Sequence, residues 1–317
     1  MNDVPEITEL FINEMFQANV EPLFRRNVDY TDLERFSFTK KQNKQVEEIL
    51  NKKFSVLGFD IYKYSKFPQE KQIYIPLVLQ KVYEYAVRLL KDNFTFLFQK
   101  VEKTYFLNGL ISTGDGGFLI LETPLHSIIF GLVFETVFRM FNSYRFLPRL
   151  RQTVEGVTVR YAITYDNVYR FKNKYFGSAI INNSRLLSKD KLNRLLIDSA
   201  TYEWFMKSIA GVENLQTTTL KELKGLSNFK DYDDKFFDEQ NALIPAEHLQ
   251  NIGLKNEGIK SVDIQKIGVT KSKDTDLDVY NLHIQAIIEF QKVFQEAMIF
   301  TVSLGNLNAS GISVSEV

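Results

Sequence analysis

Between residues 54 and 205, apolar runs of strand length alternate with apolar side chains at helical spacing. The order in which they alternate limits the folds that the chain can adopt. Residues 54–61 are a short apolar run of strand length, and residues 73–90 repeat apolar side chains at helical spacing. Two further apolar stretches, 105–111 and 118–121, flank the sequence Ser-Thr-Gly-Asp-Gly-Gly at 112–117. Because glycine adopts positive φ without strain, this segment predicts a β-hairpin with a tight tip.

The alternation continues beyond the hairpin. Residues 125–144 predict a second long helix, 157–164 a strand, 176–187 the start of a helix and 191–205 further helix. Helices and strands in this order predict an α+β domain of the α/β-sandwich type, in which helices cover a sheet.

The flanking regions divide the rest of the chain. Residues 1–50 predict an N-terminal helical segment, with helical spacing at 7–16 and a polar helix or linker at 40–53. The domain is expected at 51–235 and a C-terminal extension at 236–303, with 229–240 as an acidic, aromatic linker. In the extension, 261–285 alternates like strands around a polar turn at 271–278, and 284–302 reads as a helix. Residues 304–317 are small and polar and predict a disordered tail.

Composition narrows the functions that are open to the chain. Lysine plus arginine number 39, as do aspartate plus glutamate, so the zero net charge argues against capture of a nucleic acid polymer. The absence of cysteine excludes thiol chemistry and fits a reducing cytoplasm. His126, His248 and His283 share no ligand-like spacing, so a bound metal would need oxygen ligands, which points to Mg²⁺ or Mn²⁺.

No membrane span or export signal is predicted. The most apolar stretch, residues 126–137, is shorter than the 18 or so residues that a spanning helix needs. The N-terminus is acidic and lacks a basic region followed by an apolar one, so we expect a cytoplasmic protein.

Two aspartates stand where predicted strands end. Asp60 closes the strand at 54–61, and Asp115 lies at the hairpin tip. Together they offer hard oxygen ligands for a divalent cation, and the backbone N–H groups after Asp60 offer a phosphate cradle. Each also has an ordinary interpretation, Asp60 as a helix cap and Asp115 as a turn residue.

Five motifs in order resemble those of class III nucleotidyl cyclases. They are Asp-Ile-Tyr-Lys-Tyr-Ser at 60–65, Ser-Thr-Gly-Asp-Gly-Gly-Phe at 112–118, the strand at 157–164, Gly-Ser-Ala-Ile-Ile-Asn-Asn-Ser-Arg-Leu at 177–186 and Leu-Lys-Gly at 223–225. The resemblance covers roughly residues 50–235 and implies the family's fold, a mostly antiparallel sheet covered by helices.

The resemblance also implies a site. Asp60 and Asp115 match the family's metal-binding aspartates, and with Ile61 they would hold two Mn²⁺ or Mg²⁺ ions. The backbone from Ile61 to Ser65 would bind the triphosphate, and Arg185 matches the transition-state arginine. In the family these parts come from two subunits, so the resemblance implies a homodimer with composite sites.

The sequence departs from the family at two functional positions. The catalytic asparagine position falls on Ile181, and a one-residue shift would present Asn182, with Asn183 as the alternative. Ile111 stands where a lysine or glutamate selects the purine, and the second selecting position falls near Lys174. Neither purine code is present, so the usual basis for purine discrimination is missing.

This pattern resembles the pyrimidine cyclases of bacterial anti-phage (Pycsar) signalling. It implies conversion of UTP to 3′,5′-cyclic UMP, a second messenger read by a separate effector protein. The alternatives are a cytidylate cyclase that makes cyclic CMP, an atypical adenylate cyclase and a cyclase-like nucleotide sensor without catalysis. Tyr64 replaces the family's phenylalanine, and its ring either packs in the core or brings a hydroxyl to the base or ribose.

Two more residues carry structural expectations. Arg170 is expected to form an ion pair with a nearby carboxylate, and His126 is expected to be a structural or capping histidine.

Overall fold

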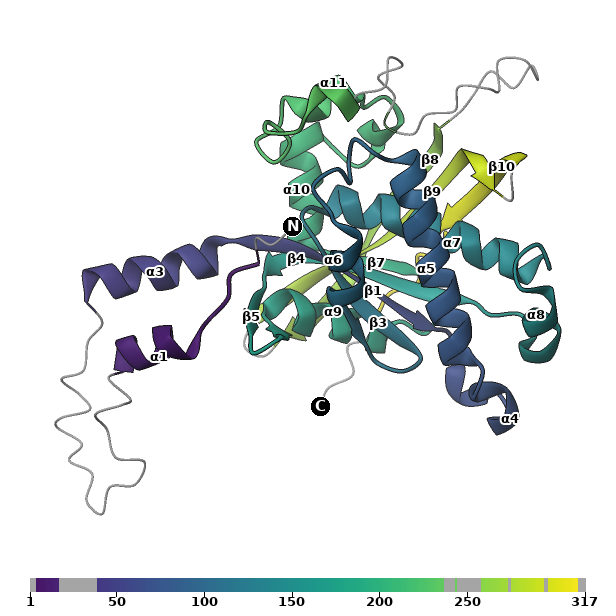
Figure 1. Ribbon diagram of the computed structural model, residues 1–317, viewed down its shortest axis with the longest axis horizontal. Helices are drawn as coiled ribbons and strands as arrows, with labels where there is room; N and C mark the ends of the chain where they lie inside the picture. Colours follow the sequence, from purple (N-terminus) through teal and green to yellow (C-terminus); the bar gives the residue numbers. More distant parts are fainter. Residues whose placement is uncertain are drawn as a thin grey trace.

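The computed structural model describes residues 4–16, 39–236, 243, 258–272, 275–293 and 296–312. A curved sheet forms the centre, with helices against both of its faces (Figure 1). The strands follow the order β10-β9-β7-β4-β1-β3-β2, and β8 pairs with β9 outside this path. Their bounds are β1 Lys53–Ile61, β2 Leu110–Ser112, β3 Gly116–Leu121, β4 Val159–Asn167, β7 Leu195–Asp198, β8 Gly258–Ser272, β9 Thr275–Val293 and β10 Glu296–Leu304.

The sheet is mostly antiparallel. Among the described strands, β4 and β7 are the parallel pair, and every other pairing in the large sheet is antiparallel. The small hairpin of β5 Tyr169–Phe171 and β6 Lys174–Phe176 forms a separate two-stranded sheet. The predicted α+β architecture with helices over a mostly antiparallel sheet is therefore confirmed.

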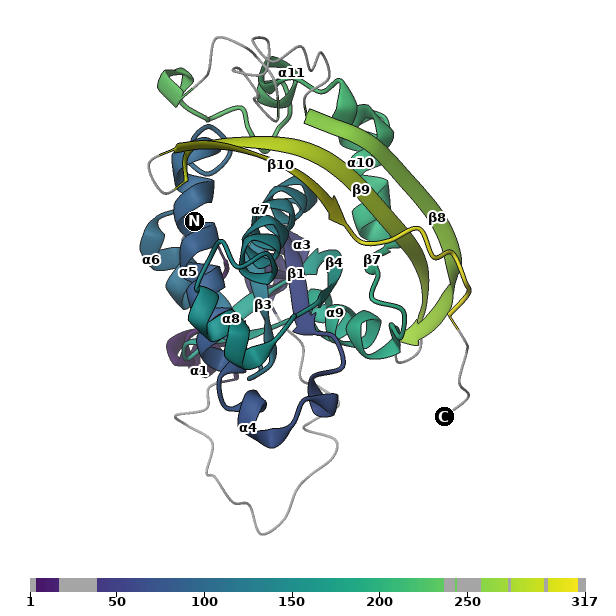
Figure 2. The ribbon, with the colours of Figure 1, turned by 90° about the vertical axis from the view of Figure 1, so that its right-hand side faces the viewer.

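Helices cover the two faces unequally. α5 Ile75–Asn93 and α7 Pro124–Asn142 pack on the concave face, and α9 Ser178–Lys189 packs on the other (Figure 2). The remaining described α-helices are α1 Glu9–Phe16, α3 Lys40–Asn51, α4 Gln69–Gln72, α6 Lys103–Asn108, α8 Pro148–Val154, α10 Ser199–Ile209 and α11 Leu220–Lys224. The described 3₁₀ turns are η1 Tyr64–Lys66, η2 Glu213–Gln216 and η3 Asp234–Phe236.

The predicted elements of the central region are largely present, with two corrections. Residues 105–108 belong to α6, and only 110–112 form the first hairpin strand. Residues 195–198 form β7 before α10 begins, within the segment predicted as helix. All four residues of β7 are buried, so the strand lacks the alternation that would separate it from a buried helix.

The C-terminal extension completes the sheet. The predicted strands at 261–285 are confirmed, but the predicted helix at 284–302 is wrong, because these residues form β9 and β10. The main core cluster includes every second residue of this stretch: Ile284, Ala286, Ile288 and Phe290. This spacing of two residues is that of a strand and not of a helix.

Two segments that were predicted to lie outside the core are part of the structure. In the predicted linker at 229–240, Phe229 and Tyr232 are buried, and Tyr232 donates a hydrogen bond to Glu122. In the predicted disordered tail, residues 304–312 pack against the body, where Ile312 is buried and its N–H donates to the carbonyl of Ile267.

α7 is the central helix of the domain. By length and composition its 19 residues are enough to cross a membrane, so the apolar stretch is longer than the sequence pattern suggested. However, 89% of its most apolar window is buried inside the protein, as in the core helix of a soluble domain. Its residue His126 is buried, with ring nitrogens bonded to Thr123 Oγ1 (2.8 Å) and Leu97 O (2.9 Å), which confirms a structural histidine.

The N-terminal helices lie beside the body. α3 leads into β1, and α1 and α3 project together away from the sheet (Figure 1). Arg170 pairs with Glu6, and the N–H groups of Ile7 and Arg170 bond to the carbonyls of Arg170 and Pro5. The expected ion pair of Arg170 is therefore confirmed, and it fixes the chain before α1 to the β5–β6 hairpin.

Candidate active site

Asp60 and Asp115 meet at the end of the β1–β3 pair. Asp60 is in register with Gly116, and the N–H of Ile61 donates to the carbonyl of Asp115 at 3.0 Å. A Cβ at Gly116 would lie 2.2 Å from the carbonyl oxygen of Phe59, so only glycine lets the hairpin tip approach β1 this closely. The two predicted metal-binding aspartates are therefore brought together by strand register.

The two carboxylates repel one another. Burial raises the pKa of Asp60, the Arg160 guanidinium lowers it, and the neighbouring Asp115 carboxylate raises it again, with a net rise above the ordinary value. Asp60 Oδ1 is buried without a hydrogen-bond partner. Facing carboxylates with a bare buried oxygen suit a divalent cation, although no third acidic or histidine side chain joins them among the described residues.

Arg160 holds Asp60 from the next strand. It lies opposite Asp60 in the β1–β4 register, and its Nε and Nη2 donate to Asp60 Oδ2 at 3.0 and 2.5 Å. Its Nη1 donates to the carbonyl of Asp190 just after α9. The sequence pattern predicts that Arg160 lies on this strand, but it does not predict the contact with Asp60. That contact depends on the β1–β4 register, which only the folded sheet defines.

The segment after Asp60 turns back sharply. Lys63 has φ 60°, and the 3₁₀ turn η1 follows. The side chain of Ile61 is buried in the core, Tyr64 packs against the same core, and Ser65 is exposed. The tyrosine ring therefore has the packing position that was one of its two interpretations.

The two asparagines of α9 have different surroundings. Asn183 is fully buried, and its Nδ2 donates to the carbonyls of Val56 (2.7 Å) and Ala162 (3.0 Å) on the underlying strands. Asn182 is 9% exposed, and Ile181, at the family's asparagine position, is 41% exposed. Asn183 therefore holds α9 on the sheet, and Asn182, the predicted catalytic asparagine, is the next residue on the same helix.

Arg185 lies three residues after Asn182, so both belong to one side of α9. The helix runs over the sheet face that carries Asp60 and Arg160, since Asn183 contacts β1 beside Gly58 and the Asp190 carbonyl meets Arg160. Arg185 is partly buried. Both predicted catalytic residues thus belong to the helix that covers the aspartate side of the sheet.

Ile111, at the predicted base-selecting position, is an apolar residue in apolar surroundings. Ile111 on β2 pairs with Phe118 and packs against a small cluster that contains Phe54, Val56 and Ile120. Lys174 on β6 is exposed. Neither residue sits in a network that would read a purine edge.

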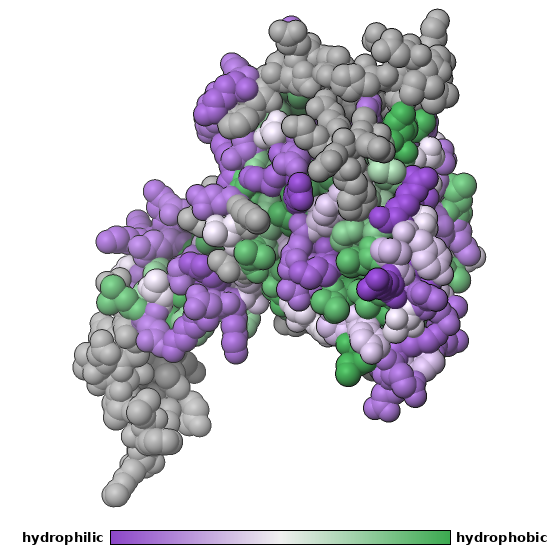
Figure 3. Space-filling model, turned by 45° about the vertical axis from the view of Figure 1, so that its right-hand side comes forward, coloured by the Kyte–Doolittle hydropathy of each residue, from purple (hydrophilic) through white to green (hydrophobic). Residues whose placement is uncertain are grey.

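The surface beside the hairpin is partly apolar. A cleft of about 330 Å³ lies between α5 and the hairpin, and its lining includes Tyr83, Leu107 and Gly114. Figure 3 views the side where α5 lies and shows apolar surface among hydrophilic residues. The exposed apolar side chains of α5, α6 and the residues just before α5 include Ile73, Tyr74, Leu77 and Leu107.

Comparisons with known proteins find similarity at the level of solved structures. No family model matches the chain, and no curated protein matches it. An adenylate/guanylate cyclase/hydrolase from Silicibacter pomeroyi is 13% identical, with a TM-score of 0.38, over 73% of this chain and 95% of that one. The adenylyl cyclase CyaB from P. aeruginosa is 10% identical, with a TM-score of 0.35, over 73% and 93%.

The guanylyl cyclase domain of the RhoGC fusion protein from Blastocladiella emersonii, in its monomeric crystal structure, is 15% identical, with a TM-score of 0.34. It covers 50% of this chain and 86% of that one. These are likenesses of overall shape, and the assignment of an activity depends on the residues of the site.

Proposed function

We propose that this chain is a class III nucleotidyl cyclase that converts UTP to 3′,5′-cyclic UMP and pyrophosphate. The observation that carries the proposal is the convergence of Asp60 and Asp115, with Asp60 Oδ1 buried and bare, at the end of the β1–β3 pair. The ordered cyclase-like motifs around these same residues support it.

The residues divide the chemistry among them. Asp60 and Asp115, with the backbone of Ile61, would hold two Mn²⁺ or Mg²⁺ ions, which supply positive charge to the triphosphate and the attacking 3′-oxygen when bound. The backbone of the turn through Tyr64 and Ser65 would position the triphosphate.

Arg185 would stabilise the charge that develops on the α-phosphate as the 3′-oxygen attacks and pyrophosphate leaves. Asn182, on the same side of α9, would orient the ribose. Both would act on a substrate held by the partner subunit, so the active form is a symmetric homodimer with two composite sites.

Base preference follows from what the site lacks. Ile111 offers no hydrogen bond to a purine edge and packs into an apolar cluster, which favours a pyrimidine base. UTP is placed before CTP because uridylate cyclases are the commoner activity among the pyrimidine cyclases that the motifs resemble. An atypical adenylate cyclase is the remaining catalytic alternative. The product would serve as a cytoplasmic second messenger in anti-phage defence and act on a separate effector protein.

A non-catalytic nucleotide sensor is the main alternative, and one observation favours it. Ile181 stands at the family's asparagine position and is exposed, so the position that normally carries chemistry is apolar. Asp60, Asp115 and Arg185 favour the enzyme, because a sensor has little need of both metal ligands and a transition-state cation.

A substrate panel tests the proposal. Purified protein is incubated separately with UTP, CTP, ATP and GTP plus Mn²⁺, and products are identified by mass spectrometry. Cyclic UMP as the main product supports the proposal, and cyclic CMP or cyclic AMP supports the corresponding alternative. Nucleotide binding without any cyclic product would support the sensor.

A further inference from the structure

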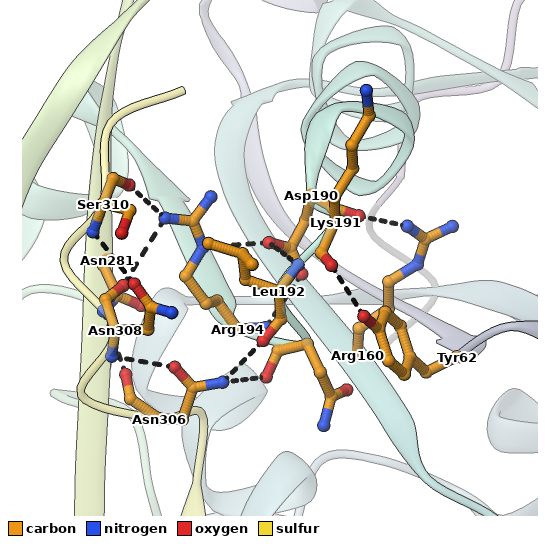
Figure 4. Close-up of polar contacts among 11 residues, drawn as sticks. Tyr62, Arg160, Asp190, Lys191, Leu192, Arg194, Asn281, Asn306, Asn308 and Ser310 are labelled. Carbon is orange, nitrogen blue, oxygen red and sulfur yellow. Dashed lines mark hydrogen bonds and ion pairs between the residues drawn. The ribbon is translucent and has the colours of Figure 1, made fainter. Parts of the chain in front are cut away.

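A chain of polar contacts links the segment after β10 to Asp60. Figure 4 shows this network, which runs from the C-terminal segment through the loop after α9 to Tyr62 and Arg160. The C-terminal segment is defined here as residues 306–310, and the loop as residues 190–194. Neither matches a cyclase motif, so their contacts require a separate explanation.

The loop carbonyls accept hydrogen bonds from Arg160, which binds Asp60, and from Tyr62, which lies two residues after Asp60. Arg160 Nη1 donates to Asp190 O at 2.5 Å, and the Tyr62 hydroxyl donates to Lys191 O at 2.6 Å. Because the same guanidinium binds Asp60 Oδ2, the position of the loop limits where Arg160 can place that oxygen.

A buried ion pair between Arg194 and Asp190 joins the two ends of the loop. Arg194 and Asp190 are 2% and 1% exposed, with Arg194 Nε 2.9 Å from Asp190 Oδ1. The backbone N–H of Arg194 donates to Asp190 Oδ2 at 2.8 Å. A buried pair of this kind is stable only when its remaining donors are satisfied.

The C-terminal segment supplies an acceptor for Arg194 and a donor for two loop carbonyls. Arg194 Nη1 donates to Ser310 O at 2.6 Å, and Asn306 Nδ2 donates to Leu192 O at 2.8 Å and Asn193 O at 2.5 Å. Asn281 on β9 in turn donates to the carbonyls of Asn306 and Asn308, which fixes the segment to the sheet.

The same region also supports α9. Ile312 belongs to the buried cluster that contains Leu186 and Leu187, which directly follow Arg185. The end of the described chain therefore shares a buried cluster with the helix that carries Arg185, and it bonds to the loop that holds Arg160.

We propose that Asn306 is a positioning residue for the metal site: its amide fixes the loop, and the loop fixes Arg160 on Asp60. The expected effect on metal affinity rests on the proposed cyclase function, whereas the effect on the position of Arg160 does not. Residues that orient metal ligands from outside typically change metal affinity by about 10- to 100-fold when they are lost.

Asn306→Asp is the sharpest test. It keeps the side-chain size and an oxygen that can accept from the N–H of Asn308, but it turns a carboxylate toward two loop carbonyls. Asn306→Ser removes the same donors without adding charge. Leu307→Ala is the matched control, because Leu307 is the next residue and 64% exposed.

Two readouts are taken on folded protein. The first is Mn²⁺ affinity without nucleotide, from the free Mn²⁺ signal in electron paramagnetic resonance. The second is the Arg160 Nε–H resonance in nitrogen-15 spectra, assigned with Arg160→Lys. Both Asn306 variants should weaken Mn²⁺ binding by about tenfold and shift or broaden this resonance, and Leu307→Ala should do neither.

An unchanged Arg160 resonance together with Mn²⁺ affinity within about twofold of wild type would overturn the inference. If wild-type protein binds no Mn²⁺ and forms no cyclic nucleotide, the proposed function fails instead. The Arg160 resonance then decides the inference alone: a shift in the Asn306 variants supports it, and no shift overturns it.

Discussion

Arg160 donates two hydrogen bonds to a single oxygen of Asp60, and the other oxygen of that carboxylate is buried without a partner. The arrangement keeps Asp60 in place, and the Arg160 guanidinium offsets part of the rise in the pKa of Asp60 that burial and the Asp115 carboxylate cause. Two neighbouring carboxylates lower the stability of the fold when no cation is bound, and the same pair can bind a cation.

Asp115→Asn should therefore separate stability from activity. Without metal, removing the repulsive charge should raise the free energy of unfolding by roughly 0.5–1 kcal/mol at neutral pH. The same change should abolish turnover, since a metal site rarely tolerates the loss of a carboxylate. Urea unfolding and product assays measure the two effects.

Asp92→Asn is the control for this prediction. Its carboxylate is exposed and 3.8 Å from Arg88 on the same helix, so both stability and activity should stay near wild type. A destabilised or fully active Asp115→Asn protein would contradict the account of the pair.

Gly58→Ala should disturb the packing of α9 on β1. A Cβ at Gly58 would lie 1.8 Å from Asn183 Oδ1 and 2.8 Å from Leu187 Cδ1, so the helix must move. We expect a loss of about 1–3 kcal/mol in the free energy of unfolding. Gly156→Ala, where the nearest atom is 3.5 Å away, should change it by less than about 0.5 kcal/mol.

The neighbouring asparagines of α9 should behave differently. Asn183→Ala removes two buried hydrogen bonds, to the carbonyls of Val56 and Ala162, and should destabilise the protein by about 2–3 kcal/mol. Asn182→Ala should instead lower kcat by about 100-fold at a smaller loss of stability. Thermal melts together with steady-state kinetics distinguish the two; the reverse assignment would move the catalytic role to Asn183.

His126 should make the fold sensitive to acid. Burial lowers its pKa from 6.5 to about 4, so its stabilising contribution is present above pH 6.5 and is lost as the pH falls toward 4. Linkage gives a loss of about 2 kcal/mol between about pH 7 and pH 5 relative to His126→Gln. Parallel urea titrations of the two proteins would show no such divergence if the imidazole were charged in the fold.

Local periodicity was enough to predict the framework of the site. β1, the hairpin tip, α5, α7, β4 and α9 each have a clear spacing or a glycine signature, and together they position Asp60, Asp115 and Arg185. The close approach of Asp60 and Asp115 followed from their places at the ends of adjacent strands.

What escaped prediction depends on contacts between distant residues. The Asp60–Arg160 pair joins positions 100 residues apart through a strand register. Residues 306–310 are small and polar like a disordered tail, yet Asn306 and Ser310 bind a loop more than 110 residues earlier in the sequence. No local pattern encodes such partners.

The central claim is a composite, metal-dependent cyclase site, and mixing two inactive variants tests it most directly. Asp115→Asn and Arg185→Ala proteins are unfolded together, refolded as a mixture and assayed with UTP and Mn²⁺. Each variant alone should be inactive. In an equal mixture, half of all dimers should be heterodimers, and each heterodimer has one intact site of two, which gives about a quarter of wild-type cyclic UMP synthesis. A mixture as inactive as its parts, or full activity in either variant alone, would contradict the account.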